Sequence, residues 1–213
     1  MPDLEGLRSA VFKGDMAGAE QATREALDKG VPAPEVLNQG LVPSMEAVGK
    51  AMKDGEYFIP EVLLSSRAFG AAIAILQPFL NEEAPGLSRG KVVLGTVKGD
   101  LHDIGKNLVA VMLRGAGFEI IDLGSDVPPE RFVEAAQEAN ADVVGLSALI
   151  TTTMVGMRDV IQCFEENNWR NRVKVIIGGA PVTDRFAEEI GADGYSPDAA
   201  GAIDLVRDLL NRN

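Results

Sequence analysis

The chain has 213 residues, of which 46% are hydrophobic and 24% are charged, and its formal net charge is −12. This composition is typical of a globular protein with a substantial core, and the negative charge disfavours nucleic acid and anionic membrane surfaces as partners. A single cysteine, Cys163, rules out a disulfide framework. With no signal peptide and no unbroken apolar run long enough to cross a bilayer, we expect a cytoplasmic protein.

The amino-terminal part, residues 1–84, shows helical periodicity without strand-like alternation. Its apolar residues recur at spacings that predict four amphipathic helices joined by short connections, which is the pattern of a small helical bundle. Asp15 is suited to cap the start of the second helix and Gly30 to end it. Pro43 lies within the third helical pattern, where its missing N–H predicts a kink or a break.

The fourth helical pattern is predicted to begin at Pro60 and to end near Pro78. It is followed by NEEAPGLSRG, a polar segment that contains proline and glycine. Such a composition is typical of a connection between domains. We therefore predict a helical bundle over residues 1–84, a linker over residues 85–90 and a second domain over residues 91–213.

The second domain consists of short runs rich in Val and Ile that alternate with helical patterns. The runs are KVVLGTV, FEIIDLG, ADVVGLS and VKVIIGG, with a weak fifth at ADGYS. Three of the first four are nearly continuous in apolar residues, as expected for strands buried on both faces. This pattern predicts an α/β fold with a flavodoxin-like, five-stranded parallel sheet in the order 2-1-3-4-5. Ligands bind such sheets at the carboxyl ends of the strands, near the first and third.

The only histidine, His102, directly follows the first predicted strand in the segment DLHDIG. Asp100 could accept a hydrogen bond from one of its ring nitrogens and thereby fix the tautomer, as in the second shell of a metal ligand or behind a general base. A plain surface histidine is the alternative. There is no second histidine and no cysteine cluster, which excludes an ordinary zinc or iron site. A role as metal ligand therefore needs a metal whose other positions are filled, as in a macrocycle.

Other notable residues follow the third and fourth predicted strands. Ser147 and Leu149 form an S-x-L motif, and Gly178 and Gly179 form a GG motif. Together with the D-x-H-x-x-G motif around His102, these motifs resemble the cobalamin-binding domain of methionine synthase, adenosylcobalamin mutases and corrinoid proteins of methyltransferase systems. The first half is similar to the helical cap of the same proteins, because it carries the pattern V-G-x-x-x-x-x-G-x-x-F-x-P. The resemblance covers nearly the whole chain.

The resemblance implies a site for cobalamin or a related corrinoid. His102 would replace the cofactor's own base as the lower axial ligand of cobalt, Asp100 would hydrogen-bond the far ring nitrogen, and Thr153 would supply the hydroxyl for which methionine synthase uses serine. Phe58 matches an aromatic residue of the cap that covers the upper face of the corrin. The other implied cofactor contacts are Gly99, Leu101, Asp103, Ile104, Gly105, Ser147, Leu149, Thr151, Gly178, Gly179, Gly194, Tyr195 and Ala199.

The resemblance further implies a methyl carrier. Such a protein accepts a methyl group on cobalt(I) from a substrate-specific methyltransferase and delivers it to an acceptor methyltransferase, with tetrahydrofolate as the expected acceptor, and a corrinoid reactivase serves it. No barrel for a methyl donor or folate is evident, so we expect a carrier subunit. Two alternatives remain, a cobalamin-based sensor and the cobalamin-binding subunit of a mutase. Sensors add a DNA-binding region, which nothing in this sequence resembles. Mutase subunits generally lack the helical cap, which this sequence carries.

Overall fold

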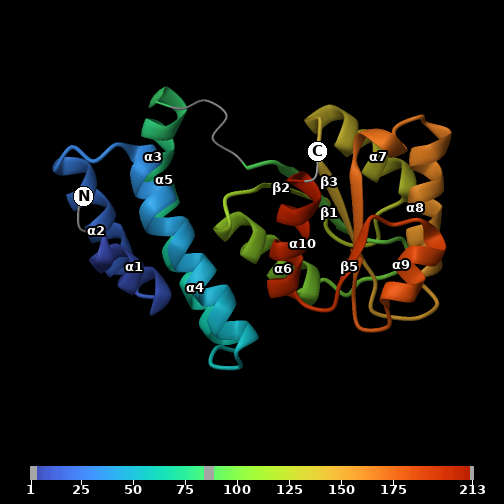
Figure 1. Cartoon of the computed structure of the whole chain (residues 1–213), viewed down its shortest axis with the longest axis horizontal. Helices are drawn as coiled ribbons and strands as arrows, with labels where there is room; N and C mark the ends of the chain where they lie inside the picture. The colour runs from blue at the N-terminus through green and yellow to red at the C-terminus, as the bar shows by residue number, and fades with distance from the viewer. Residues whose placement is uncertain (1–3, 84–88, 212–213) are drawn as a thin grey trace. The chain divides into compact units, whose positions relative to one another are not determined.

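The computed structural model describes residues 4–83 and 89–211, apart from the side chains of residues 81–83. These residues divide into two compact units, a helical unit at the amino-terminal end and an α/β unit from Arg89 onward. Most of the predicted linker, residues 85–88, lies outside the described residues, so its boundaries stay a prediction. Figure 1 shows the elements of each unit along the chain.

The helical unit is built from successive helices that pack through their apolar faces. Asp15 caps the second helix through its side chain, which accepts a hydrogen bond of 3.0 Å from the backbone N–H of Gly18. Gly30 follows the end of the same helix in the left-handed region, with a φ of 78°. Both residues therefore act as predicted. The elements are α1 (Glu5–Phe12), α2 (Met16–Asp28), α3 (Ala33–Glu35), the π-helical turn η1 (Val36–Leu41), α4 (Val42–Lys53) and α5 (Ile59–Glu83).

The two internal prolines of this unit act differently. The helix does not break at Pro43, which lies in the first turn of α4 directly after the π-helical turn η1. Pro43 has no N–H to donate to the carbonyl of Gln39, and this carbonyl accepts a hydrogen bond of 2.9 Å from Nε of Arg8. Pro78 was wrongly predicted to end the fourth helix, since α5 continues through it to Glu83. The proline removes one hydrogen bond, but its fixed φ of about −65° is itself helical.

One described helix, α5, is long and apolar enough over Ile59–Leu80 to cross a membrane, judged by length and composition alone. Its mean hydropathy is 1.5 in the most apolar window. The sequence-based expectation considered only unbroken apolar runs and therefore missed this segment. A core helix of a helical bundle passes the same test, and α5 packs against α1, α2 and α4 in the helical unit.

In the α/β unit, the described strands form one parallel sheet in the order β2-β1-β3-β4-β5, as predicted. Figure 1 shows α6 and α10 on one face of this sheet and α7, α8 and α9 on the other. The strands are β1 (Lys91–Thr96), β2 (Glu119–Asp122), β3 (Val143–Ser147), β4 (Lys174–Gly178) and β5 (Gly194–Ser196). The helices are α6 (Ile104–Gly115), α7 (Pro129–Ala139), α8 (Val155–Glu166), the 3-10 turn η2 (Arg170–Arg172), α9 (Asp184–Ile190) and α10 (Ala199–Asn211).

The central strands are buried on both faces because helices cover both sides of the sheet. On the side of α7, α8 and α9, alternate strand residues such as Val93, Val144 and Val175 share one core cluster with Phe132 and Phe164. Gly95 of β1 lets Phe132 approach closely, because a Cβ atom at Gly95 would lie 2.5 Å from that ring. The strand that leads to His102 is thus packed directly against α7.

Candidate functional site

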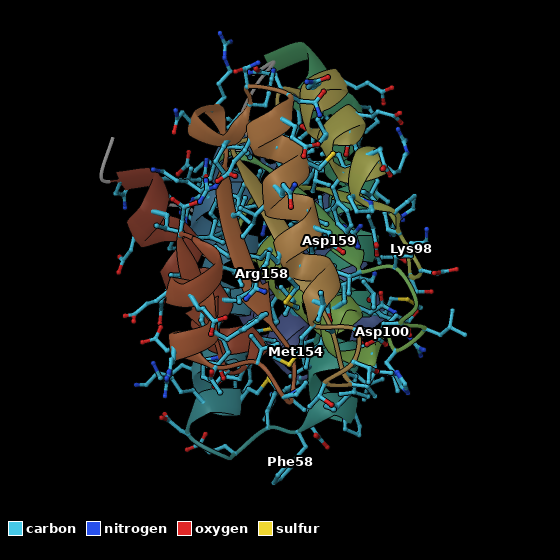
Figure 2. The ribbon with its side chains drawn as sticks, turned by 90° about the vertical axis from the view of Figure 1, so that its right-hand side faces the viewer. Phe58, Lys98, Asp100, Met154, Arg158 and Asp159 are labelled. Carbon is cyan, nitrogen blue, oxygen red and sulfur yellow. The ribbon has the colours of Figure 1, made fainter. Side chains whose placement is uncertain are left out.

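The site lies where the strands end. Thr96 of β1, Ser147 of β3, Gly178 of β4 and Ser196 of β5 form one row across the sheet. The loops that follow these residues therefore leave the sheet from the same edge, as the alternation of strands and helices predicted. Figure 2 shows Asp100, from the loop after β1, and Met154, just before α8, at the same end of the α/β unit.

Asp100 connects the loop after β1 to the loop after β3. Its side chain is fully buried. One carboxylate oxygen accepts hydrogen bonds from the backbone N–H of His102, at 3.0 Å, and from Nδ1 of the same residue, at 2.8 Å. The other oxygen accepts from the hydroxyl of Thr153, at 2.7 Å, and from the backbone N–H of Leu149, at 2.8 Å. The structure therefore brings together the three residues predicted to form a chain, His102, Asp100 and Thr153.

These hydrogen bonds determine the charge of Asp100 and the tautomer of His102. Burial raises the pKa of Asp100, but the hydrogen bonds from Thr153, from the N–H of Leu149 and from both N–H groups of His102 outweigh burial, so the pKa lies well below its usual range. An ionised carboxylate can only accept hydrogen bonds, so the shared proton resides on Nδ1 of His102. Its Nε2 then carries a lone pair that can bind a metal.

The surroundings of His102 are apolar although they are exposed. The imidazole itself is 55% exposed. In the described part of the α/β unit, every large hydrophobic side chain that is exposed belongs to the two loops that Asp100 joins or to the first turns of the helices after them. These side chains are Leu101 at 73%, Ile104 at 73%, Leu149 at 44%, Ile150 at 42% and Val155 at 55%. We call this set the apolar rim. A clustered apolar surface of this kind indicates a binding site.

The GG motif allows two backbone segments to approach each other. Gly179 has a φ of 129°, which L side chains rarely adopt, and a Cβ atom there would lie 1.9 Å from the carbonyl oxygen of Ala148. A Cβ atom at Gly178 would lie 3.2 Å from the carbonyl oxygen of Ser196. Glycine is therefore required at position 179 for the loops after β3 and β4 to meet, and these loops flank Ser147 and Thr151.

Some predicted cofactor residues have structural roles that are evident in the fold. Gly194 makes room for Leu205 of α10, whose side chain would lie 2.7 Å from a Cβ atom there. Tyr195 packs against the core cluster, and Ala199 is buried at the start of α10. Asp103 accepts a hydrogen bond of 2.8 Å from the N–H of Asn107 through its backbone carbonyl. The contacts of these four residues with a cofactor stay a prediction.

The helical unit contains the remaining predicted site residue, Phe58. Its side chain is 66% exposed and projects outward in Figure 2. Its backbone N–H donates a 3.0 Å hydrogen bond to the carboxylate of Glu61 in the first turn of α5. The preceding residue, Tyr57, donates from its hydroxyl to the carbonyl of Phe12, at 3.0 Å. The turn that carries Phe58 is thus held from both sides within its own unit.

Sequence reasoning missed several residues that support the histidine loop. The buried Thr96 donates from its hydroxyl to the carbonyl of His102, at 3.1 Å. Lys106, whose side chain is 2% exposed, forms hydrogen bonds of 2.6 and 2.7 Å to both carboxylate oxygens of Asp122. Burial raises the pKa of Asp122, but the hydrogen bonds from Lys106 and from the N–H of Gly124, together with the charges of Lys106 and Arg114, outweigh burial and lower it. Thr96 and His102 are six positions apart and Lys106 and Asp122 are 16 positions apart, and the spacing of the residues predicts neither contact.

The fold and the site define a class of protein, namely an α/β ligand-binding domain that presents a histidine backed by a carboxylate within an apolar surface and that follows a helical unit. Two family models, each described as a B12 binding domain, match residues 90–204 and residues 3–77. Dimethylamine corrinoid protein 1 of Methanosarcina acetivorans is 46% identical over 99% of this chain and 97% of its own length.

Solved structures agree with this classification. A cobalamin-binding protein from Desulfitobacterium hafniense DCB-2 is 34% identical, with a TM-score of 0.81 over 98% of this chain and 99% of that one. The methanol:cobalamin methyltransferase complex MtaBC from Methanosarcina barkeri contains a chain that is 28% identical, with a TM-score of 0.90 over 100% of this chain and 82% of that one. The chain belongs to the family of B12-binding corrinoid proteins.

Proposed function

We propose that this chain carries a corrinoid whose lower axial ligand is His102 and that it serves as the methyl carrier of a methyltransferase system. The observation that carries this proposal is the half-exposed imidazole, whose Nδ1 lies 2.8 Å from the carboxylate of Asp100 and which lies within the apolar rim. A flat, largely apolar macrocycle with a central metal suits this surface, because it covers the rim and needs one nitrogen ligand from the protein. The bound cobalt supplies the chemistry, since it can accept a methyl group and give it up.

The residues of the site fix the position of one proton. Asp100 keeps this proton on Nδ1 of His102 and so leaves the lone pair of Nε2 available. Thr153 and the N–H of Leu149 keep Asp100 ionised.

The remaining predicted contacts complete the proposal. Gly178 and Gly179 allow backbone segments to approach closely at the end of the sheet where Ser147 ends β3. This arrangement supports a binding place there for the nucleotide tail of the corrinoid, whose own base His102 would replace at cobalt. Thr151 is exposed in the loop after β3 and offers a hydroxyl. A role for the exposed Phe58 in covering the upper face of the corrin is part of the proposal and rests on the family resemblance.

The proposed partners follow from the carrier role. One methyltransferase loads the corrinoid and another unloads it, with tetrahydrofolate as the proposed acceptor, and a reactivase restores the reduced cofactor. The names of the relatives make dimethylamine and methanol the first methyl donors to test. A cytoplasmic location is also proposed, and the single cysteine supports it.

The decisive experiment uses the fact that the chain has one histidine. The protein is produced with 15N-histidine, loaded with an unlabelled cobalt(II) corrinoid and studied by electron paramagnetic resonance. Ligation by His102 changes the nitrogen hyperfine pattern from the triplet of 14N to the doublet of 15N. A triplet that is unchanged by the label shows that the cofactor's own base holds cobalt, and it refutes the proposed ligation.

A further inference from the structure

The loop between β2 and α7 is attached to the end of β1 and to the histidine loop. The backbone N–H of Thr96 donates to the carbonyl of Gly124, at 2.9 Å, and the N–H of Val127 donates to the carbonyl of Thr96, at 3.0 Å. Val97 and Val127 form an isolated parallel bridge. The loop therefore continues the pairing of β1 beyond the end of the strand, up to the point where the chain turns toward His102.

Asp126, at the centre of this loop, holds the histidine loop at two points. Its side-chain oxygen Oδ1 accepts a hydrogen bond of 2.7 Å from the backbone N–H of Gly99. Its own backbone N–H donates a hydrogen bond of 3.0 Å to the carbonyl of Asp100. The first bond holds the peptide unit that precedes Gly99, and the second holds the peptide unit that follows Asp100. The two bonds therefore bracket the Gly99–Asp100 segment, whose backbone sets the direction of the Asp100 side chain.

The backbone of this clamp has an unusual conformation. Asp126 has a φ of 57°, and Gly99 has a φ of 82°. Residues other than glycine, asparagine and aspartate rarely adopt a positive φ. The hydrogen bonds of Asp126 offset the cost of this conformation. A role in holding the histidine loop accounts both for these hydrogen bonds and for the positive φ of Asp126.

We propose that Asp126 is a positioning residue, which holds the Gly99–Asp100 backbone so that the carboxylate of Asp100 meets Nδ1 of His102 on one side and Thr153 on the other. Its importance for the cofactor rests on the proposed function, whereas its effect on the hydrogen bond between Asp100 and His102 concerns the cofactor-free chain. Asp126 touches neither the imidazole nor Thr153 through any described hydrogen bond, so it acts through Asp100.

Two substitutions change the side-chain acceptor of Asp126 while they preserve its backbone conformation. Asp126→Gly keeps the positive φ, which glycine adopts readily, but removes the acceptor for Gly99. Asp126→Asn keeps both the tolerance of positive φ and a side-chain oxygen, but it loses the negative charge. Asp142→Asn is a matched control, because Asp142 also accepts a 2.7 Å hydrogen bond from a backbone N–H, that of Lys91, at the opposite end of β1.

The test is nuclear magnetic resonance of the cofactor-free protein labelled with 15N, at alkaline pH values where the 15N shifts of His102 no longer change with pH. The 15N shifts of His102 report which ring nitrogen carries the proton. We expect wild type and Asp142→Asn to show the Nδ1–H form. Asp126→Gly should show a mixture of both forms and an exchange rate of the Gly99 amide that is about tenfold higher, and Asp126→Asn should lie between them.

The outcome is decisive in both directions. If the Gly99 amide loses protection in Asp126→Gly while His102 keeps the Nδ1–H form, Asp126 only shapes its own loop and the inference is wrong. If Asp126→Gly does not fold, the same comparison is made with Asp126→Asn, in which faster exchange of the Gly99 amide while His102 keeps the Nδ1–H form likewise overturns the inference.

A second measurement separates this inference from the proposed function. The apparent affinity of the cobalt for His102, measured from the hyperfine pattern in loaded protein, should fall about two- to tenfold in Asp126→Gly, which is the effect of one lost hydrogen bond. If wild type shows no histidine hyperfine pattern, the proposed ligation fails, and the tautomer measurement still decides the role of Asp126. If wild type shows the pattern and Asp126→Gly leaves both tautomer and affinity unchanged, the positioning role fails alone.

Discussion

Replacing Asp100 by asparagine tests the centre of the site. The wild-type carboxylate is fully buried and accepts hydrogen bonds from Thr153, from the N–H of Leu149 and from both N–H groups of His102. The substituted amide offers one oxygen and one NH2 group, so at least one of these donors faces another donor. Hydrogen bonds to a charged group contribute about 1.5–3 kcal/mol each. We therefore expect Asp100→Asn to lower the free energy of unfolding of the α/β unit by about this amount.

The pH dependence of this loss has a definite sign. The folded pKa of Asp100 lies below the unfolded value of about 3.9, so the carboxylate contributes its stability above that value. The contribution is lost as the pH falls through about 4 toward the folded pKa. The difference in unfolding free energy between wild type and Asp100→Asn should thus be constant near neutral pH and shrink at about pH 3.

Trp169 provides the assay, because it is the only tryptophan of the chain and lies in the α/β unit. Urea unfolding of cofactor-free protein is followed by its fluorescence at neutral pH and at about pH 3. The same variant, loaded with a corrinoid, should bind cobalt through His102 about 10- to 100-fold more weakly, as is typical for groups that support a metal ligand. A variant that matches wild type in stability at neutral pH and in the histidine hyperfine pattern would falsify the central role of Asp100.

Three further substitutions test other parts of the site. His102→Ala should retain the corrinoid with lower affinity, because many contacts to the macrocycle remain, but its cobalt(II) spectrum should lose the histidine hyperfine component; an identical spectrum excludes His102 as the ligand. Gly179→Ala should unfold at a lower urea concentration or fail to fold, because a Cβ atom would lie 1.9 Å from the carbonyl oxygen of Ala148 at a φ of 129°. The control Gly191→Ala, with a φ of 77° and no atom within 4 Å, should lower the free energy of unfolding by about 1 kcal/mol. Equal losses of unfolding free energy in both variants contradict the close approach. Lys106→Met should lower the free energy of unfolding by about 1–3 kcal/mol, because Asp122 loses its charged partner, and an unchanged urea midpoint shows that this ion pair contributes nothing.

Local patterns in the sequence determined the architecture of the α/β unit. Valine- and isoleucine-rich runs marked each strand, and their alternation with helical patterns was sufficient for the order β2-β1-β3-β4-β5. The pairing of Asp100 with His102 could also be expected, because the two residues are two positions apart in one loop and need no long-range contact. The end of a helix is harder to predict from local patterns, since Pro78 was expected to end a helix that continues to Glu83.

Only the tertiary structure decided which distant groups complete the site. Thr153 donates to Asp100 from 53 positions away, and Asp126 accepts from Gly99 across 27 positions. The resemblance suggested the first contact, but no periodicity or spacing predicts either, since each depends on how two loops leave neighbouring strands. The resemblance implied cofactor contacts at Leu101, Ile104 and Leu149, but neither composition nor periodicity shows that the side chains of the apolar rim are exposed together. Their exposure follows from the row of strand ends, because the edge of a parallel sheet has no helix to cover its loops.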